Sequence, residues 1–220
     1  VGNDFKKDSF QYSIVVNAKG ERFLDEGADF RNFTYAKYGG IILQQPGQLA
    51  WQIFDSKVTG LLRDEYHIRQ VTRVRADTLE DLADQLYGVD PKGFLATVAA
   101  FNDAVARDVP FNPNAKDGKC THGLAVAKSN WANTIDEPPF EAYGVTCGIT
   151  FTFGGLRILP SCDVIDVDGN PIPGLFACGT IVGGLFYFNY PGGAGIASGA
   201  VFGKTAGESA AMASGQRTST

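Results

Sequence analysis

The sequence contains few of the residues on which metal and redox-thiol sites are built. It has two histidines, and its four cysteines lie far apart, at Cys120, Cys147, Cys162 and Cys178. Zinc and iron–sulfur centres need closely spaced cysteine or histidine ligands, and no Cys-x-x-Cys spacing occurs, so neither kind of metal site is predicted. Thiols without a pairing pattern favour a reduced protein of the cytoplasm.

Long apolar runs and concentrated positive charge are also missing. No segment reaches membrane-spanning length, and residues 1–7 lack the apolar core and cleavage site of a signal peptide. The 24 acidic and 19 basic side chains leave a net charge of −5, and the basic residues are scattered, which disfavours nucleic acid as a partner. We therefore expect a cytoplasmic protein without a transmembrane segment. Because the chain starts at Val1 rather than at methionine, we expect it to begin inside a longer protein.

The first part of the chain reads as a mixture of strands and helices. Alternation around a tight glycine turn at 17–20 predicts a β-hairpin over residues 12–24. Apolar spacing and capping residues predict further elements. These are a strand over 49–54, a helix over 56–65 capped by Ser56, a helix over 77–86, and a helix over 90–107. Residues 25–45 are ambiguous because Gly39 and Gly40 interrupt a helical pattern.

After Glu137-Pro-Pro139 the pattern changes to short strands. These are expected over 140–147, 149–159, 163–167 and 174–178, with a turn at 168–170 and a small-residue helix over 195–207. We place a domain boundary between residues 138 and 139. The predicted fold class is α+β, with 44% hydrophobic residues available for a core.

Two glycine-rich stretches are the candidates for ligand binding. Thr150-Phe-Thr-Phe-Gly-Gly155 marks either a β-bulge or a place where a flat ligand approaches the backbone. The stretch from Gly174 to Gly207 joins a strand, a glycine turn and a helix, which either packs tightly on a sheet or offers helix amides to a polar cofactor edge. Their order favours the ligand, because such strand ends converge on one crevice in an open sheet.

Four motifs, in chain order, resemble the fumarate reductase and succinate dehydrogenase flavoprotein family. They are Asn17-Ala-Lys-Gly-Glu-Arg-Phe23, Thr152-Phe-Gly-Gly155, Gly174-Leu-Phe-Ala-Cys-Gly179 and Tyr190-Pro-Gly-Gly-Ala-Gly195. Within the family, segments 120–124, 128–132 and 145–155 are most similar to the FAD-dependent tricarballylate dehydrogenases, which oxidise a tricarboxylate to an unsaturated one. The Tyr-Pro-Gly element is also similar to flavin-dependent ketosteroid dehydrogenases.

The resemblance implies a fold and a function. Residues 1–138 would form a capping domain, and residues 139–220 the C-terminal β-rich segment and helix of an interrupted, Rossmann-like FAD-binding domain. The Gly-x-Gly-x-x-Gly fingerprint would lie upstream of Val1, so the isolated chain is expected to be inactive. The implied enzyme dehydrogenates a small polycarboxylate by hydride transfer to flavin, with a separate electron-acceptor protein as a further partner. The alternatives are a flavoenzyme acting on a ketosteroid or tetrapyrrole, and a non-catalytic module that lacks the ADP-binding half.

The resemblance also assigns site residues. Arg31 aligns with the proton-transferring arginine of the capping domain, against the alternative of a salt bridge with Asp25 or Glu26. Tyr190 would donate its hydroxyl to a substrate carbonyl or carboxylate, against the alternative of aromatic packing, and Thr152 is the third catalytic candidate. The predicted cofactor-binding residues are Gly154, Gly155, Gly179, Thr180, Gly192, Gly193, Ala194, Gly195 and Ile196, with the amides around 192–196 facing the flavin's pyrimidine edge.

The chain departs from the family at three places. Thr180 stands where a glutamate is usual, Thr150 and Phe151 stand where fumarate reductases have a histidine, and Tyr190 replaces an arginine. The first removes a charged acceptor for a cofactor hydroxyl, and the other two replace substrate-binding groups and so argue against fumarate as the substrate. The aromatic run Phe186-Tyr-Phe188 leaves an apolar substrate as an alternative.

Overall fold

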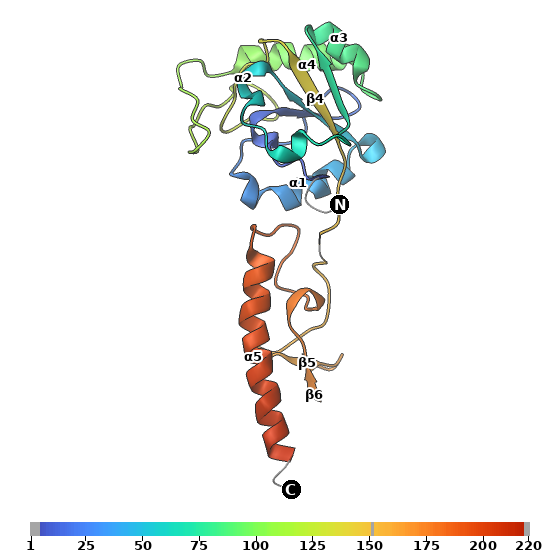
Figure 1. Ribbon diagram of the computed structural model, residues 1–220, viewed down its shortest axis with the longest axis vertical. Helices are drawn as coiled ribbons and strands as arrows, with labels where there is room; N and C mark the ends of the chain where they lie inside the picture. Colours follow the sequence, from blue (N-terminus) through green and yellow to red (C-terminus); the bar gives the residue numbers. More distant parts are fainter. Residues whose placement is uncertain (1–4, 151, 218–220) are drawn as a thin grey trace. The chain divides into compact units, whose positions relative to one another are not determined.

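The computed structural model describes residues 5–150 and 152–217, and it divides the chain into two compact units. The first unit comprises Val1–Cys147 and the second Gly148–Thr220. Figure 1 shows the sheet and most of the short helices in the first unit and one long helix in the second. Within the described ranges, no helix combines the length and the apolar composition needed to cross a membrane.

The first unit is built on a four-stranded antiparallel sheet in the order β1-β2-β4-β3. The strands are β1 (Ile14–Val16), β2 (Ala50–Phe54), β3 (Arg73–Ala76) and β4 (Phe140–Val145). The helices are α1 (Tyr35–Leu43), α2 (Ser56–Thr59), α3 (Leu79–Gln85) and α4 (Pro91–Ala104). Helix α1 runs through Gly39 and Gly40 without a break.

Alternate residues of the strands build a core on each face of the sheet. Ile14, Ile53 and Ala142 pack with the apolar stripes of α3 and α4. Val15, Ala50 and Val145 pack with α1. Because successive strand side chains point to opposite faces, the sheet is covered on both sides. The predicted apolar faces of α3 and α4 both lie in this core.

The starts of the helices follow from capping side chains. Asp90 accepts hydrogen bonds from the Lys92 and Gly93 amides, and Pro91 opens α4, as the sequence predicted. The predicted cap of α2 was wrong, because Asp55 rather than Ser56 accepts from the Lys57 amide. The carboxylate of Asp55 reaches that amide from an extended residue, whereas Ser56 is already helical.

The predicted hairpin over 12–24 forms only as a turn. The Gly20 amide bonds to the Asn17 carbonyl, and one bridge joins Val16 to Arg22, but residues 21–24 make no strand. A side chain takes the place of the missing strand, because Glu26 accepts a 2.7 Å hydrogen bond from the Val15 amide. Strand β1 pairs instead with β2.

The division between the units falls later than the predicted boundary at 138. Strand β4 pairs with β2 on one side and β3 on the other, so residues 140–147 complete the sheet of the first unit. The sequence pattern located β4 correctly but grouped it with the C-terminal segment. The strands that pair with β4 are distant in sequence, so a local pattern does not reveal them.

The second unit has little regular structure apart from its long helix. Its strands β5 (Asp163–Ile165) and β6 (Pro171–Phe176) form an antiparallel pair, and α5 spans Ala194–Arg217. The predicted strand over 149–159 is not formed by its described residues, which make only isolated bridges at Leu156 and Ile158. The predicted turn forms, with Asp166 accepting hydrogen bonds from the Asp168 and Asn170 amides.

Candidate functional site

The second unit contains a small hollow next to the glycine-rich motifs, here called the glycine hollow. Its lining residues are Thr152, Phe153, Gly179, Thr180, Val182, Leu185, Phe186, Gly195 and Ser198. They come from the loop after residue 151, from the single 3₁₀ turn Gly179–Ile181 and the loop after it, and from the first turns of α5. Four residues predicted from the sequence, Thr152, Gly179, Thr180 and Gly195, therefore meet there.

Two backbone hydrogen bonds hold two of these segments together, and a pair of glycines allows the close approach. The Leu156 amide bonds to the Ile181 carbonyl at 2.8 Å, and the Gly183 amide bonds to the Leu156 carbonyl at 3.0 Å. A Cβ added to Gly155 would lie 2.2 Å from the Ile181 carbonyl oxygen, and one added to Gly183 would lie 2.4 Å from the Gly155 nitrogen. Gly155 is thus required by contact between backbone segments, whatever its relation to a ligand.

Other glycines border open space. A Cβ added to Gly154, Gly179 or Gly193 would meet nothing within 4 Å. Gly179 and Gly193 also have φ angles of +76° and +88°, which side-chain-bearing residues rarely adopt. These positions leave room for a flat group to approach the backbone, which fits the isoalloxazine ring of a flavin.

The start of α5 supplies hydrogen-bond donors. The Ala194 amide bonds to the Pro191 carbonyl and the Ala197 amide to the Gly193 carbonyl, so the helix begins directly after the glycine turn. The first amides of an α-helix, here those around Gly195 and Ile196, have no carbonyl partner within the helix and lie at the positive end of its dipole. This arrangement suits a polar ring edge that gains negative charge.

Tyr190 is held beside the glycine hollow by both polar and aromatic contacts. Its hydroxyl oxygen is 2.8 Å from the Thr150 hydroxyl oxygen. Its ring lies 5.9 Å, centroid to centroid, from each of the Phe153 and Phe186 rings, which line the hollow. The sequence placed Thr150 in a glycine-rich candidate stretch and among the departures from the family, but it did not predict the contact with Tyr190. Phe151, the other departure at that point, lies outside the described residues.

Arg31 lies in the first unit, at the start of the 3₁₀ turn Arg31–Phe33, which precedes α1. Its guanidinium, 32% exposed, is 3.7 Å from the Asp8 carboxylate. The expected partners Asp25 and Glu26 are engaged elsewhere: Asp25 accepts from the Ser129 amide and Glu26 pairs with Arg22. Burial raises the pKa of Asp8, and the positive charge of Arg31 opposes that rise.

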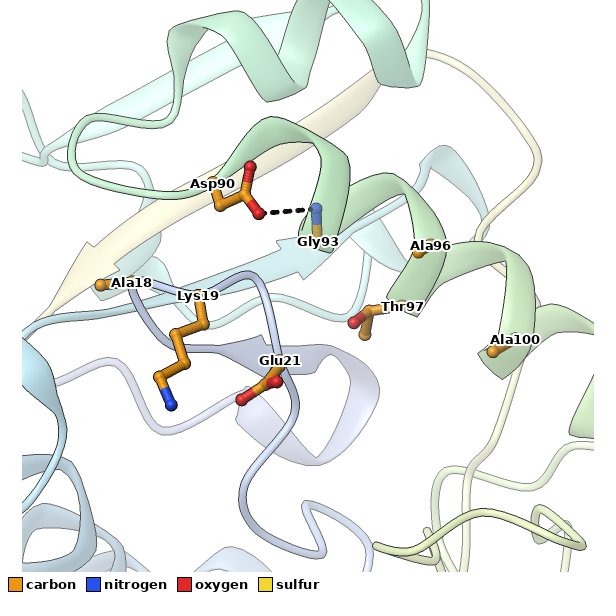
Figure 2. A pocket seen from close by; sticks show the side chains of 8 residues that line it. All are labelled: Ala18, Lys19, Glu21, Asp90, Gly93, Ala96, Thr97 and Ala100. Atoms are coloured by element: carbon orange, nitrogen blue, oxygen red, sulfur yellow. Dashed lines mark hydrogen bonds between the residues drawn. The ribbon is translucent and has the colours of Figure 1, made fainter.

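A larger hollow of about 620 Å³ lies in the first unit between the turn after β1 and helix α4 (Figure 2). Small side chains of α4, among them Ala96 and Ala100, leave it open. Asp90 already accepts from the first amides of the helix, including that of Gly93 as drawn in Figure 2. None of the predicted site residues lines this hollow.

The side chains that line the glycine hollow are uncharged. None of its nine lining residues carries a charge, and its polar side chains are hydroxyls. Among residues 5–150 and 152–217, no group of three or more His, Cys, Asp or Glu is placed to hold a metal ion. The hollow measures only about 10 Å³, far less than a ligand needs, so its backbone amides, hydroxyls and aromatic rings can serve a ligand only as one wall of a larger site.

Comparison with known proteins defines the class to which this geometry belongs. The family model described as an FAD binding domain matches residues 4–196, so the chain belongs to that family. Its cofactor is FAD, and the open glycine positions and helix start are compatible with one edge of that cofactor.

The individual relatives are oxidoreductases. The chain is 34% identical over 202 residues to a Shewanella frigidimarina protein named "Probable fumarate reductase Ifc3", covering 90% of this chain and 31% of that protein. It is 30% identical over 221 residues to the 4-oxocyclohex-2-ene-1-carboxylate 5-dehydrogenase of Sinomonas cyclohexanicum, covering 93% and 37% respectively. The chain thus spans about a third of the length of these relatives.

A solved structure has the same fold. The 3-ketosteroid Δ1-dehydrogenase of Sterolibacterium denitrificans, solved with 1,4-androstadiene-3,17-dione, matches with a TM-score of 0.69 and 26% identity, over 94% of this chain and 41% of that one. The predictions of an α+β flavoprotein fold, of FAD, and of a resemblance to the fumarate reductase family are confirmed.

Proposed function

We propose that this chain is the cap-bearing and C-terminal part of an FAD-dependent oxidoreductase that dehydrogenates a carbon–carbon bond next to a carbonyl or carboxyl group. The family match and the oxidoreductase relatives support this proposal, as does the coverage of about a third of their length. The first unit would act as the capping domain, and the second would carry one edge of the flavin site. When bound, FAD supplies the hydride acceptor.

The residues that would hold FAD are those around the glycine hollow. The backbone at Gly154 and Gly179 would face the ring, and the hydroxyl of Thr180 would replace the charged acceptor usual in the family. Of the amides from Gly192 to Ile196, that of Ala194 already donates to the Pro191 carbonyl, and those of Gly192, Gly193, Gly195 and Ile196 would face the edge on which negative charge develops. The open Cβ positions at Gly154, Gly179 and Gly193 are the observation that carries this assignment.

The first candidate substrate class is a small polycarboxylate, such as tricarballylate. Arg31 supports it, because a guanidinium binds a carboxylate through paired hydrogen bonds, and here it already lies near a carboxylate, that of Asp8. In this proposal Arg31 fixes a substrate carboxylate and takes part in proton transfer, and Thr152 contacts the substrate from the glycine hollow.

The second candidate class is a ring ketone, and the lining of the glycine hollow favours it. Phe153 and Phe186 offer aromatic surface, and Tyr190 offers an uncharged hydroxyl suited to a carbonyl oxygen. A polycarboxylate would need several cations, whereas the lining residues carry no charge. Two relatives act, by their names, on ring ketones, one of which also carries a carboxylate.

A substrate panel separates the classes. The intact flavoprotein that contains this chain would be mixed anaerobically with tricarballylate, succinate, 4-oxocyclohexane-1-carboxylate or 4-androstene-3,17-dione, and bleaching of the flavin absorbance would be followed. Bleaching by a ring ketone alone favours the second class, and bleaching by tricarballylate alone favours the first. A protein that binds FAD but is bleached by none of them contradicts the proposed function.

The non-catalytic alternative is tested by cofactor binding. The 220-residue chain would be titrated with FAD and the flavin fluorescence followed. Because the chain spans about a third of its relatives, we expect weak or no quenching from the chain alone and full binding by the intact protein. An intact protein that fails to bind FAD would favour the non-catalytic module.

A further inference from the structure

Contacts of two kinds hold the Tyr190 side chain in place, ring against ring and hydroxyl against hydroxyl. Tyr190 is 6% exposed, and the Phe153 and Phe186 rings, each 5.9 Å away between centroids, fix the position of its ring. The Thr150 hydroxyl, contributed from forty residues away in the sequence, meets the phenolic oxygen at 2.8 Å. The position of the ring and the orientation of its hydroxyl are therefore set by separate groups.

The surroundings give this hydroxyl pair a specific chemistry. Phe153 and Phe186 also line the glycine hollow, and no lining residue carries a charge. An uncharged site of this kind favours a substrate that presents a neutral carbonyl oxygen there, because a carboxylate would lose its hydration without gaining a counter-ion.

The hydrogen bond between the two hydroxyls has a direction that matters for catalysis. A hydroxyl donates once and accepts at up to two lone pairs, and here either oxygen is able to donate. When Thr150 donates to the Tyr190 oxygen, the phenolic hydrogen is directed away from Thr150. Linked hydroxyls also polarise one another, which strengthens the phenol as a donor.

We propose that Thr150 is a positioning residue that orients the Tyr190 hydroxyl toward a carbonyl oxygen of the substrate. Dehydrogenation takes a proton from the carbon next to the carbonyl, to a general base, and a hydride from the following carbon, which bound FAD would accept. Negative charge therefore grows on the carbonyl oxygen as the proton leaves, so a correctly directed donor stabilises the transition state more than the ground state. This inference rests on the proposed function and selects the ring-ketone class within it.

A purely structural role for Thr150 predicts different behaviour. In that case the hydrogen bond only ties the segment before residue 151 to the turn before α5, and its loss lowers stability without changing selectivity. Thr150→Val keeps the shape of the side chain and removes the hydroxyl, whereas Thr150→Ser keeps the hydroxyl.

The test uses the intact flavoprotein and its Thr150→Val, Thr150→Ser, Tyr190→Phe and Thr150→Val/Tyr190→Phe variants. For the most active ring ketone of the panel, we expect Thr150→Val to lower kcat/KM about tenfold, the size of one lost hydrogen bond, mainly through kcat. FAD content and melting temperature should stay close to those of the wild type. Thr150→Ser should recover most of the activity, and Thr150→Val should cost little more in the Tyr190→Phe background.

A second readout does not depend on turnover. Binding of the same ketone, followed by its perturbation of the flavin spectrum, should weaken less in Thr150→Val than kcat/KM falls. Unchanged kcat/KM in Thr150→Val, equal losses with and without the Tyr190 hydroxyl, or a wild type that neither binds nor oxidises any ring ketone would each overturn the inference. The last result leaves the proposed function standing if tricarballylate bleaches the flavin, and removes it if no substrate does.

Discussion

Arg31 is a cation that pairs with the Asp8 carboxylate and whose charge also acts on Glu65. Its side chain is partly exposed and lies 3.7 Å from the Asp8 carboxylate, a separation longer than a hydrogen bond. An arginine in this setting keeps hydrogen-bonding capacity for a second carboxylate.

Replacing Arg31 tests its proposed part in catalysis. In the intact flavoprotein, Arg31→Gln is expected to lower kcat by about 100-fold or more, the usual size of a lost proton-transfer group, while FAD content stays normal. The matched control is Arg63→Gln, which removes another partly exposed arginine paired with a carboxylate, that of Glu65. Activity of Arg31→Gln equal to that of the control would end the assignment.

Lys128 is a buried cation in the first unit. Its side chain is 1% exposed, and its ammonium donates to the Ser13 carbonyl at 2.5 Å. Burial lowers the pKa of Lys128 to about 8, with Glu26 opposing this shift and Arg22 adding to it. The unfolded chain holds its proton up to about 10.5, so between these values the unfolded state binds more protons than the folded one.

The stability contribution of Lys128 therefore rises with pH. From about pH 8 upward, the free energy of unfolding should gain up to about 1.4 kcal/mol per pH unit from this group. Below about pH 8 the charged Lys128 lowers the free energy of unfolding by a constant amount. Lys128→Met should remove this slope, whereas the exposed Lys92→Met should keep it. Denaturant unfolding at about pH 7.5 and about pH 9 measures both, and identical slopes in all three proteins would contradict the assignment.

At the scale of elements, the segment before β5 depends on two adjacent glycines with different surroundings. Gly155 faces the Ile181 carbonyl and Gly154 faces open space. A methyl group at Gly155 must displace backbone, whereas one at Gly154 occupies only the space proposed for the flavin.

Alanine substitutions in the intact flavoprotein separate these roles. Gly154→Ala should leave the melting temperature near that of the wild type and weaken FAD binding roughly tenfold or more, about 1.4 kcal/mol. Gly155→Ala should lower stability by about 1–3 kcal/mol, as expected for overpacking. Gly207→Ala in α5, where a Cβ also meets nothing, should leave FAD binding unchanged. Equal FAD affinity in Gly154→Ala and Gly207→Ala would argue against the flavin assignment.

Local patterns predicted the elements that carry their own signals. Helices α3 and α4 have capping residues and apolar stripes, and both form where the pattern placed them. The strand expected over 149–159 does not form in its described residues. The conformation of this segment depends on glycines and on residues distant in sequence, and it contacts residues 181–183 through an isolated bridge rather than a continuous ladder.

At the scale of the molecule, the two units differ in how much apolar surface they bury. The first has three clusters of buried residues around its sheet. Among its described residues, the second has one small cluster, Val164, Ala177 and Val182 with Ile158 against it. Several of its large apolar side chains are exposed, including Leu175, Ile181, Leu185, Phe188, Ile196 and Val201.

The two units should therefore behave differently when produced separately. Residues 1–147 are expected to unfold cooperatively on heating, because their core is self-contained. Residues 148–220 are expected to melt without a cooperative transition, because a small domain with so little buried apolar surface does not offset its chain entropy. Circular dichroism melts of both pieces check this, and a cooperative melt of 148–220 would contradict it.

The sequence by itself determined the flavoprotein family, the use of FAD, and the helices whose apolar periodicity and capping residues lie close together in the chain. Only the tertiary structure decided which glycine packs against backbone and which borders open space, that β4 completes the first sheet, that Arg31 meets Asp8, and that Thr150 meets Tyr190. The reason is physical. Periodicity and capping act within a few residues of chain, whereas these contacts join residues far apart in sequence and depend on how the segments pack.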